Sequence, residues 1–115
     1  MSLNKVLLVG NLTRDPEMRQ LAPGRLMVRM GMAVNRQWVD KDGNKCEEAS
    51  FFNIVAHEEK AEILVKYAKK GRRLFIEGRL TARTVTNDKG ETRTYHDITV
   101  CEFQFLDRKA DGRQS

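Results

Sequence analysis

The sequence is poor in cysteine and proline, and it contains no long apolar segment. Its two cysteines, Cys46 and Cys101, form no CxxC pair, so neither a disulfide framework nor a tetrahedral zinc site is expected. The only early apolar run, at residues 6–9, is too short for a signal peptide, and no segment approaches the roughly 18 apolar residues of a membrane-spanning helix. We therefore expect a soluble, cytoplasmic protein without a membrane partner.

Sequence motifs of catalysis are also missing. There is no GxSxG, HExxH, P-loop or dinucleotide fingerprint, and no serine or cysteine has a recognisable base partner. Asp15 and Glu17 come nearest to a carboxylate pair, but with Pro16 between them they are first of all a turn signature. His96 has no ligand set near it in the sequence. We expect a binding protein rather than an enzyme, with no cofactor and no metal.

The residues that are present fit one charged globular domain. The 115 residues suffice for a single hydrophobic core, and 32% of them are charged, against about 25% in an average domain. The net charge is +5, and the basic excess is local, because residues 66–83 carry seven bases and one acid. This segment is either a solvated helix end and strand edge or a groove that follows a phosphate backbone, and we prefer the groove.

Periodicity predicts five strands and one helix. Apolar residues alternate, or β-branched residues gather, at residues 4–12, 25–35, 50–56, 72–85 and 92–106. Residues 58–70 have apolar spacings of three and four, with acids first, bases last and Gly71 as a stop, which is typical of a helix. Turns are expected at residues 13–16, 42–43 and 87–90.

This order of elements fits an all-β protein, a five-stranded Greek-key barrel of the OB type with one α-helix between the third and fourth strands. A β-sandwich with an inserted helix is the competing architecture. Gly31 predicts a bulge or a sharp bend, and Leu74, Ile76 and Leu80 are expected to face inward. We assign residues 1–106 to this domain and residues 107–115 to a short, polar, disordered tail.

Aromatic residues beside bases would suit single-stranded nucleic acid, whose unstacked bases bind aromatic faces without sequence preference. Trp38 follows the alternating core positions and precedes a charged hairpin tip, so it is either a lid on the barrel or a stacking platform. Phe51 is expected outside and Phe52 inside, because successive strand residues point to opposite faces. His57 at a helix N-cap and Tyr95 near a turn are further stacking candidates, with ordinary packing as the alternative.

Five blocks of the sequence carry a family resemblance. They are NKVLLVGNL from residue 4, DPEMR from residue 15, SFFNIV from residue 50, YAKKG from residue 67 and FIEGRL from residue 75. With these blocks in this order, the chain resembles the bacterial single-stranded DNA-binding protein (SSB) family from Asn4 to about Leu106. The resemblance implies an OB-fold protomer, usually in a homotetramer, that binds and protects single-stranded DNA in replication, recombination and repair, associated with the nucleoid.

The resemblance also implies roles for single residues. Trp38 and Phe51 match stacking aromatics of the family, and His57 falls where a stacking phenylalanine is common. Val85 falls where some members have a further tryptophan, so we expect a larger electrostatic share of the binding energy than in aromatic-rich relatives. Phosphate contacts are expected from Lys5, Arg19, Lys69, Lys70 and Arg83, which match basic family positions, and from Arg36, Arg72, Arg73 and Arg79.

The first strand is expected to form an interface between copies of the chain. Its apolar run of Val6, Leu7, Leu8 and Val9 has more apolar faces than a barrel interior alone can bury. The resulting homo-oligomer is expected to be a tetramer, by resemblance.

Family members generally continue into a long linker rich in Gly, Pro and Gln, which ends in an acidic tip that recruits other proteins. Residues 111–115 of the present sequence do not form such a tip, so no protein partner recruited through it is assigned to this chain. The alternative function is that of a paralogous OB module for protein assembly, with secondary binding of DNA or RNA.

Overall fold

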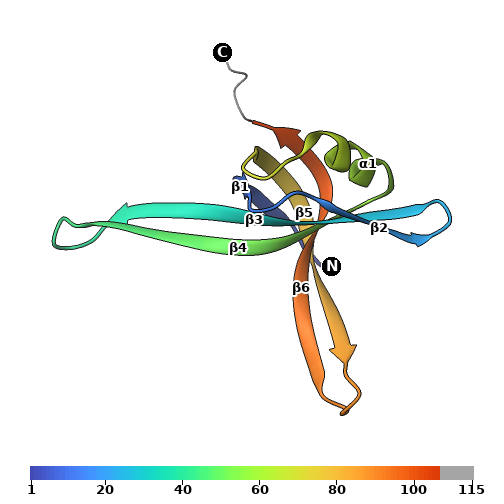
Figure 1. Ribbon diagram of the computed structural model, residues 1–115. Coiled ribbons are helices and arrows are strands. Elements are labelled where there is room, and N and C mark those ends of the chain that lie inside the picture. Colours follow the sequence, from blue (N-terminus) through green and yellow to red (C-terminus); the bar gives the residue numbers. More distant parts are fainter. Residues whose placement is uncertain (107–115) are drawn as a thin grey trace.

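The computed structural model describes residues 1–106, which form six strands and one helix (Figure 1). In chain order the elements are β1 Val6–Leu12, β2 Glu17–Ala22, β3 Arg25–Val39, β4 Lys45–His57, α1 Glu58–Tyr67, β5 Arg73–Thr86 and β6 Thr92–Phe105. The tail predicted at residues 107–115 lies outside the described residues. Within residues 1–106, no helix is long and apolar enough to cross a membrane.

Five of the strands close into a barrel. Around it the order is β1, β5, β6, β4 and β3, and β3 returns to β1 where Asn11 pairs with Ala33. Neighbouring strands are antiparallel, except that β4 and β6 run parallel at Ile54 and Ile98. This topology confirms the predicted five-stranded Greek-key barrel with one helix between its third and fourth strands, which are β4 and β5.

Alternate side chains of the strands fill the interior of the barrel, as the period-two pattern predicts. The largest of the fully buried side chains are Met30, Met32, Ile54, Leu64, Leu74, Ile76 and Val28. Phe52 packs against this core and Phe51 is exposed, which confirms the predicted facing of the two residues. Helix α1 packs on β3 and β4 and adds the buried side chains of Ala61 and Leu64 to the core.

Helix α1 is shorter than the sequence predicts, because it ends at Tyr67 and not at Lys70. Ala68 has an extended backbone, with φ −83° and ψ 140°, and its side chain is buried in the core. The N–H of Gly71 then donates to the carbonyl oxygen of Leu12 at 2.7 Å, which draws the chain back to the barrel. Packing of the connection therefore overrides the helical spacing of the sequence after Tyr67.

Strand β2 was not expected from the sequence. All six of its residues are exposed, so it has no buried face and no apolar alternation to reveal it. Its strand conformation depends on pairing with β3, from Glu17 opposite Arg29 to Ala22 opposite Arg25. Only the distant partner strand, and not the local sequence, specifies this element.

Two hairpins extend beyond the barrel as arms in different directions (Figure 1). The β3–β4 arm and the β5–β6 arm have tips near Gly43 and Gly90, whose φ values of 82° and 81° favour glycine. Both predicted turns are therefore confirmed. Strands β3 and β4 are longer than predicted, because their pairing continues to Val39 and Lys45, where no core lies beneath them.

The expected inward facing of Leu80 and the bulge expected at Gly31 are wrong, whereas the sharp bend expected at Gly31 as the alternative to a bulge stays a prediction. Leu80 is exposed, because β1 pairs with β5 only as far as Gly78 and Leu80 lies beyond the barrel. Gly31 forms no bulge, since the register between β3 and β4 is unbroken through its partner Asn53. Instead, the edge of β3 that does not pair with β4 pairs with β2 before Gly31 and with β1 after it.

Gly10 permits the barrel to close. A Cβ atom at this position would collide with the main-chain carbonyl oxygen of Ala33, on the strand that completes the barrel. The close approach of β1 and β3 therefore requires glycine here. As a result, the outer faces of β3, β4, β6 and β5 form one continuous curved surface from which both arms emerge.

Candidate nucleic-acid interface

The outer surface of β4 and β6 brings two predicted stacking residues to the same face. Val55 pairs in parallel with Thr99, so residues four positions earlier on each strand, Phe51 and Tyr95, share that face by alternation. Both residues are exposed, and 72% of the Phe51 surface is accessible. The arms diverge beyond Val55 and Thr99 (Figure 1), so Phe51 lies on the β3–β4 arm and Tyr95 on the β5–β6 arm.

Trp38 lies on the other face of the β3–β4 arm. It shares strand parity with the core residues Met30 and Met32, whereas Phe51 pairs with Ala33 on the outer face. The guanidinium of Arg36 lies 4.7 Å from the Trp38 ring centroid and also pairs with Glu48. Trp38 therefore forms a partly exposed platform that is separate from Phe51. A single-stranded nucleic acid that contacts both rings has to pass around the arm.

A surface pocket adjoins the Trp38 platform at the distal part of the arm. Its volume is about 400 Å³, and it is lined by Gln37, Trp38, Val39, Lys45, Cys46 and Glu47. A second pocket of about 280 Å³ lies near the tip of the β5–β6 arm and is lined by Val85, Asn87, Glu91, Arg93 and Tyr95. Each arm thus has a hollow beside one candidate stacking ring.

His57 occupies the N-cap position of α1, as the sequence predicts, but its side chain makes no capping hydrogen bond. By alternation it belongs to the same outer face of β4 as Phe51, and it is partly buried. Glu58, which follows it, has a φ of 55° and forms an ion pair with Arg25 at 2.9 Å. His57 therefore lies on the outer face of β4, six residues along the strand from Phe51.

The predicted basic positions divide into two groups. Five of them contact other side chains or the main chain: Lys5 with Glu77, Arg19 with Glu17, Arg36 with Glu48, Arg83 with Asp97, and Arg72 with the Tyr67 carbonyl and the Phe105 ring. Exposed bases for which no ion pair is found within residues 1–106 are Lys69, Lys70, Arg73 and Arg79. Through its contacts with the Tyr67 carbonyl and the Phe105 ring, Arg72 helps to hold the C-terminus of α1 on β6.

These bases do not form one compact patch. Arg73 and Arg83 mark the ends of the basic stretch on β5, and ten residues of strand separate them by about 33 Å. Arg79 and Arg83 lie on the outer face of β5. By register, Arg29 of β3 lies in the same row across the sheet as Arg79, and Arg93 of β6 lies on the outer face of the β5–β6 arm. Arg29 and Arg93 were not predicted as site residues from the sequence. The available signal was that both have a strand parity opposite to that of the residues that face the core.

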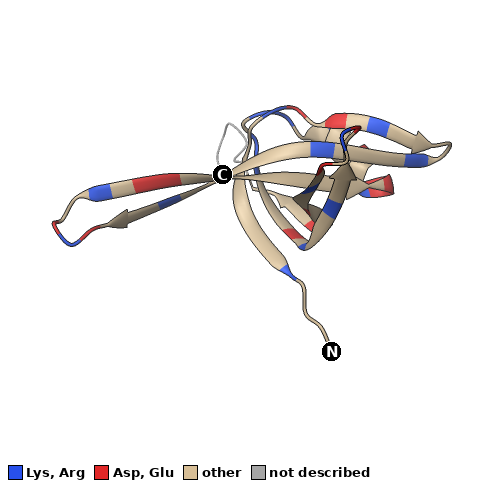
Figure 2. Cartoon of the chain, turned by 90° about the horizontal axis from the view of Figure 1, so that it is seen from below, with Lys and Arg blue, Asp and Glu red and all other residues tan. Residues whose placement is uncertain are grey.

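Charges of both signs lie on the β3–β4 arm (Figure 2). The acidic residues Glu47 and Glu48 stand on β4, opposite Gln37 and Arg36 of β3. This arm offers little net positive charge to a polyanion, so its contribution to binding depends on the rings of Trp38 and Phe51. The β5–β6 arm and its base offer the uncompensated charge of Arg79.

Asp40 holds the tip of the β3–β4 arm. Its Oδ1 atom accepts hydrogen bonds from the main-chain N–H of Asn44 at 2.8 Å and of Asp42 at 2.9 Å. The bond from Asn44 is the main cause that lowers the pKa of the Asp40 carboxyl below its usual value. At the other tip, Asn87 Oδ1 accepts the equivalent pair of bonds from Lys89 and Glu91.

Acid is therefore expected to loosen one tip and not the other. A carboxyl group whose pKa is lowered by folding stabilises the folded form above its unfolded pKa, and this contribution is lost as the pH falls through the lowered pKa. In an NMR titration, we expect the amide signals of Asp42 and Asn44 to move toward random-coil positions in that acidic range. The amides of Lys89 and Glu91 should stay in place, because Asn87 does not titrate. Equal movement at both tips would contradict the role of Asp40.

Residues 1–106 contain no group of three or more His, Cys, Asp or Glu side chains placed to hold a metal ion. A closed five-stranded barrel with one helix between β4 and β5, and with exposed rings on two arms, defines an OB-fold protein. The model of the single-strand binding protein family matches residues 3–106, and the chain belongs to this family.

Named relatives agree with this assignment. The single-stranded DNA-binding protein of Wolinella succinogenes is 42% identical over 92% of this chain and 65% of its own length. Single-stranded DNA-binding protein 1 of Lactococcus lactis is 39% identical over 98% of this chain and 75% of its own length. The chain thus spans about two thirds of the length of the Wolinella relative.

A solved structure shows the same fold. The structure of the Plasmodium falciparum SSB complex with ssDNA matches with a TM-score of 0.85 and 25% identity, over 93% of this chain and 97% of that one. The match confirms the predicted OB barrel, including the placement of the helix.

Proposed function

We propose that this chain binds single-stranded DNA without sequence preference and protects it in replication, recombination and repair. The observation that carries the proposal is that Phe51 and Tyr95 expose their rings on the outer side of the sheet, the same side as Arg79 and Arg83 of β5. Rings can stack on any unpaired base, and bases along β5 can follow the phosphates. Membership in the single-strand binding protein family supports this function, and a binding role requires no catalytic group.

We further propose a homotetramer that acts in the cytoplasm, at the nucleoid. Leu7 and Val9 on the outer face of β1 are exposed in the single chain, while Val6 and Leu8 pack against the core. Val9 is paired with Phe75 on β5, so three apolar side chains adjoin on this surface. An apolar strand face of this kind is stabilised when a second copy covers it.

The function is tested by titrating the fluorescence of Trp38, the single tryptophan, with oligo(dT), oligo(U) and duplex DNA at several salt concentrations. We expect strong quenching by oligo(dT), little by duplex, and an affinity that falls with salt. Each phosphate contact should add about 0.7 to the slope of log affinity against log salt on a single strand. A shallow slope would contradict the large electrostatic share that Val85 and His57 imply.

The other outcomes separate the alternatives. Equal binding of oligo(U) and oligo(dT) would show that the interface does not distinguish RNA from DNA, since neither stacking nor phosphate contact reads the 2′-hydroxyl. No binding to any of the three at low salt would overturn the proposal and favour an OB module for protein assembly.

A further inference from the structure

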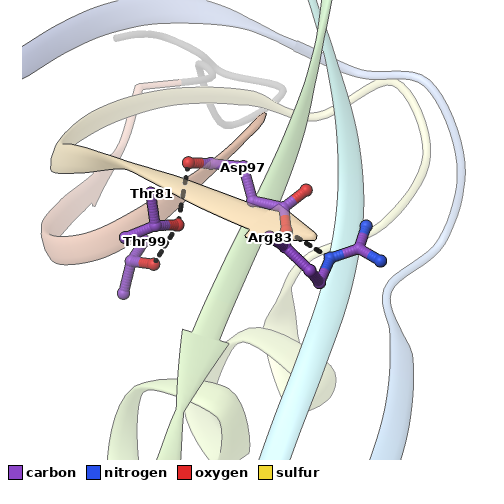
Figure 3. A network of polar contacts seen from close by, with 4 residues as sticks. All are labelled: Thr81, Arg83, Asp97 and Thr99. Atoms are coloured by element: carbon purple, nitrogen blue, oxygen red, sulfur yellow. Dashed lines mark hydrogen bonds and ion pairs between the residues drawn. The ribbon is translucent and has the colours of Figure 1, made fainter. Parts of the chain in front are cut away.

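A buried acid lies beneath the outer face of the β5–β6 arm. Asp97 on β6 is only 5% exposed, and Arg83 Nε donates to its Oδ2 at 3.1 Å (Figure 3). Its other oxygen, Oδ1, is buried and has no hydrogen-bond partner within residues 1–106. A buried carboxylate with an unpartnered oxygen destabilises a fold relative to an apolar side chain of similar size. Such a costly group is expected where function requires it.

The surroundings of Asp97 fix its position. Thr81, directly opposite on β5, donates from Oγ1 to the main-chain carbonyl oxygen of Asp97 at 3.1 Å. The same hydroxyl lies 3.3 Å from the Thr99 hydroxyl, so three polar residues of two strands are joined (Figure 3). The carboxylate is thus presented to Arg83 from a rigid part of the sheet, at the root of the arm.

Asp97 holds Arg83 across the strand pair. Arg83 is directly opposite Tyr95, and its contact with Asp97 is the diagonal one, so the side chain extends over β6. The guanidinium carbon lies 4.9 Å from the Tyr95 ring centroid. Within residues 1–106, the ion pair with Asp97 engages Nε, and 37% of the Arg83 side-chain surface stays accessible to a ligand. Arg83 therefore has a compensated charge and a fixed plane.

We propose that Asp97 is a positioning residue that holds Arg83 against Tyr95, so that the guanidinium and the phenol ring together form a stacking platform for one base of the single strand. Guanidinium planes stack on bases as aromatic rings do. The inference rests on the proposed binding of single-stranded DNA and changes the role of Arg83 from a phosphate contact to a stacking surface. Val85, two residues further along the same face, cannot stack with a base in this way.

Lysine substitution separates the two roles of an arginine. Arg83→Lys keeps the positive charge and removes the plane, so we expect an affinity for oligo(dT) about fivefold or more lower, with an unchanged salt slope. Arg25→Lys is the matched control, because Arg25 also donates from Nε to a carboxylate, that of Glu58 at 2.9 Å, but lies at the start of β3 and has no part in the proposed interface. It should bind like the wild type. If Arg83→Lys also binds like the wild type, the stacking role is overturned.

Asp97→Asn tests the positioning role. Loss of an acid beside a polyanion by itself strengthens binding, whereas release of Arg83 from Tyr95 weakens it. At about 0.5 M salt, where charges more than a few ångströms apart are screened, we expect the affinity to be about threefold or more lower. In the double variant with Arg83→Lys, the Asp97 substitution should have no further effect. Additive losses would show that Asp97 acts independently of Arg83.

An NMR measurement on the wild-type protein tests the proposal even if the Asp97→Asn variant does not fold. In the wild-type protein, the Nε–H proton of Arg83 should be protected from exchange and shifted upfield by the Tyr95 ring in NMR spectra. An unprotected proton at an unshifted position would overturn the proposal. Failure of the wild type to bind oligo(dT) would instead overturn the proposed function, because the NMR signal does not depend on DNA.

Discussion

Replacing Trp38 and Phe51 together by alanine is expected to lower the affinity for oligo(dT) by about 30-fold or more. Stacking on a ring contributes about 1–3 kcal/mol per base, a range established for single-strand-binding OB folds, this family among them. Two platforms thus contribute about 2 kcal/mol at least, which corresponds to the stated ratio. Both rings are exposed, so their loss should leave the melting temperature almost unchanged. Fluorescence anisotropy of labelled oligo(dT) measures the affinity without Trp38.

The single variants refine this expectation. Trp38 and Phe51 lie on opposite faces of the β3–β4 arm and share no contact, so their separate losses should add. Tyr67→Ala is the control, because the exposure of Tyr67 lies between those of Trp38 and Phe51, and its ring lies on α1 and on neither arm. A similar loss for Tyr67→Ala, or no loss for the double variant, would contradict the assignment of the two platforms.

Leu7→Asp is expected to dissociate the proposed tetramer. The Leu7 side chain is 58% exposed on β1 and points away from the core, so the substitution should not unfold the chain. In an interface with two-fold symmetry, the acid would occur twice, and a loss of about 2 kcal/mol at each site raises the dissociation constant by about 1,000-fold. Sedimentation should show a mass that falls from about four times 13.3 kDa to that of one or two chains.

Leu21→Asp is the matched control for this experiment. Leu21 has a similar exposure but lies on β2, which pairs with β3 and not with β1 or β5. This variant should keep the mass of the wild type. If Leu7→Asp also keeps it, the copies meet through another surface. If the wild type already has the mass of one chain, the proposed oligomer does not form.

The sequence was sufficient to predict the barrel because most of its strands have one buried face. In β3 and β5 the alternation of Met30 and Met32, or Leu74 and Ile76, follows directly from burial of one face. Where neither face of a strand is buried, the alternation of apolar residues no longer predicts it. Strand β2 and the outer parts of the arms are held by pairing with a distant strand, and Leu80 shows that a regular pattern can continue past the barrel.

The candidate site was less predictable, because it depends on contacts between strands. Residue type identified Phe51 and Tyr95 as possible platforms, but only the parallel pairing of β4 with β6 places them on one face. Net charge identified a basic segment, but it could not show that Arg83 is compensated by Asp97, fourteen residues away. Asp97 stands between His96 and Ile98, so in the sequence it looks like an ordinary polar strand residue until its partner is known.

The pairing of β1 with β5 also affects the order in which the molecule can form. Val6 pairs with Gly78, 72 positions later in the chain, and β5 in turn needs β6 as far as Phe105. Contacts so distant in sequence form slowly and late in folding. While the chain is being synthesised, β3 and β4 can pair on their own, but the barrel cannot close until nearly all of these residues have left the ribosome. The apolar face of β1 is thus completed late in folding, whereas Arg83 and Tyr95 can already meet within the local β5–β6 hairpin.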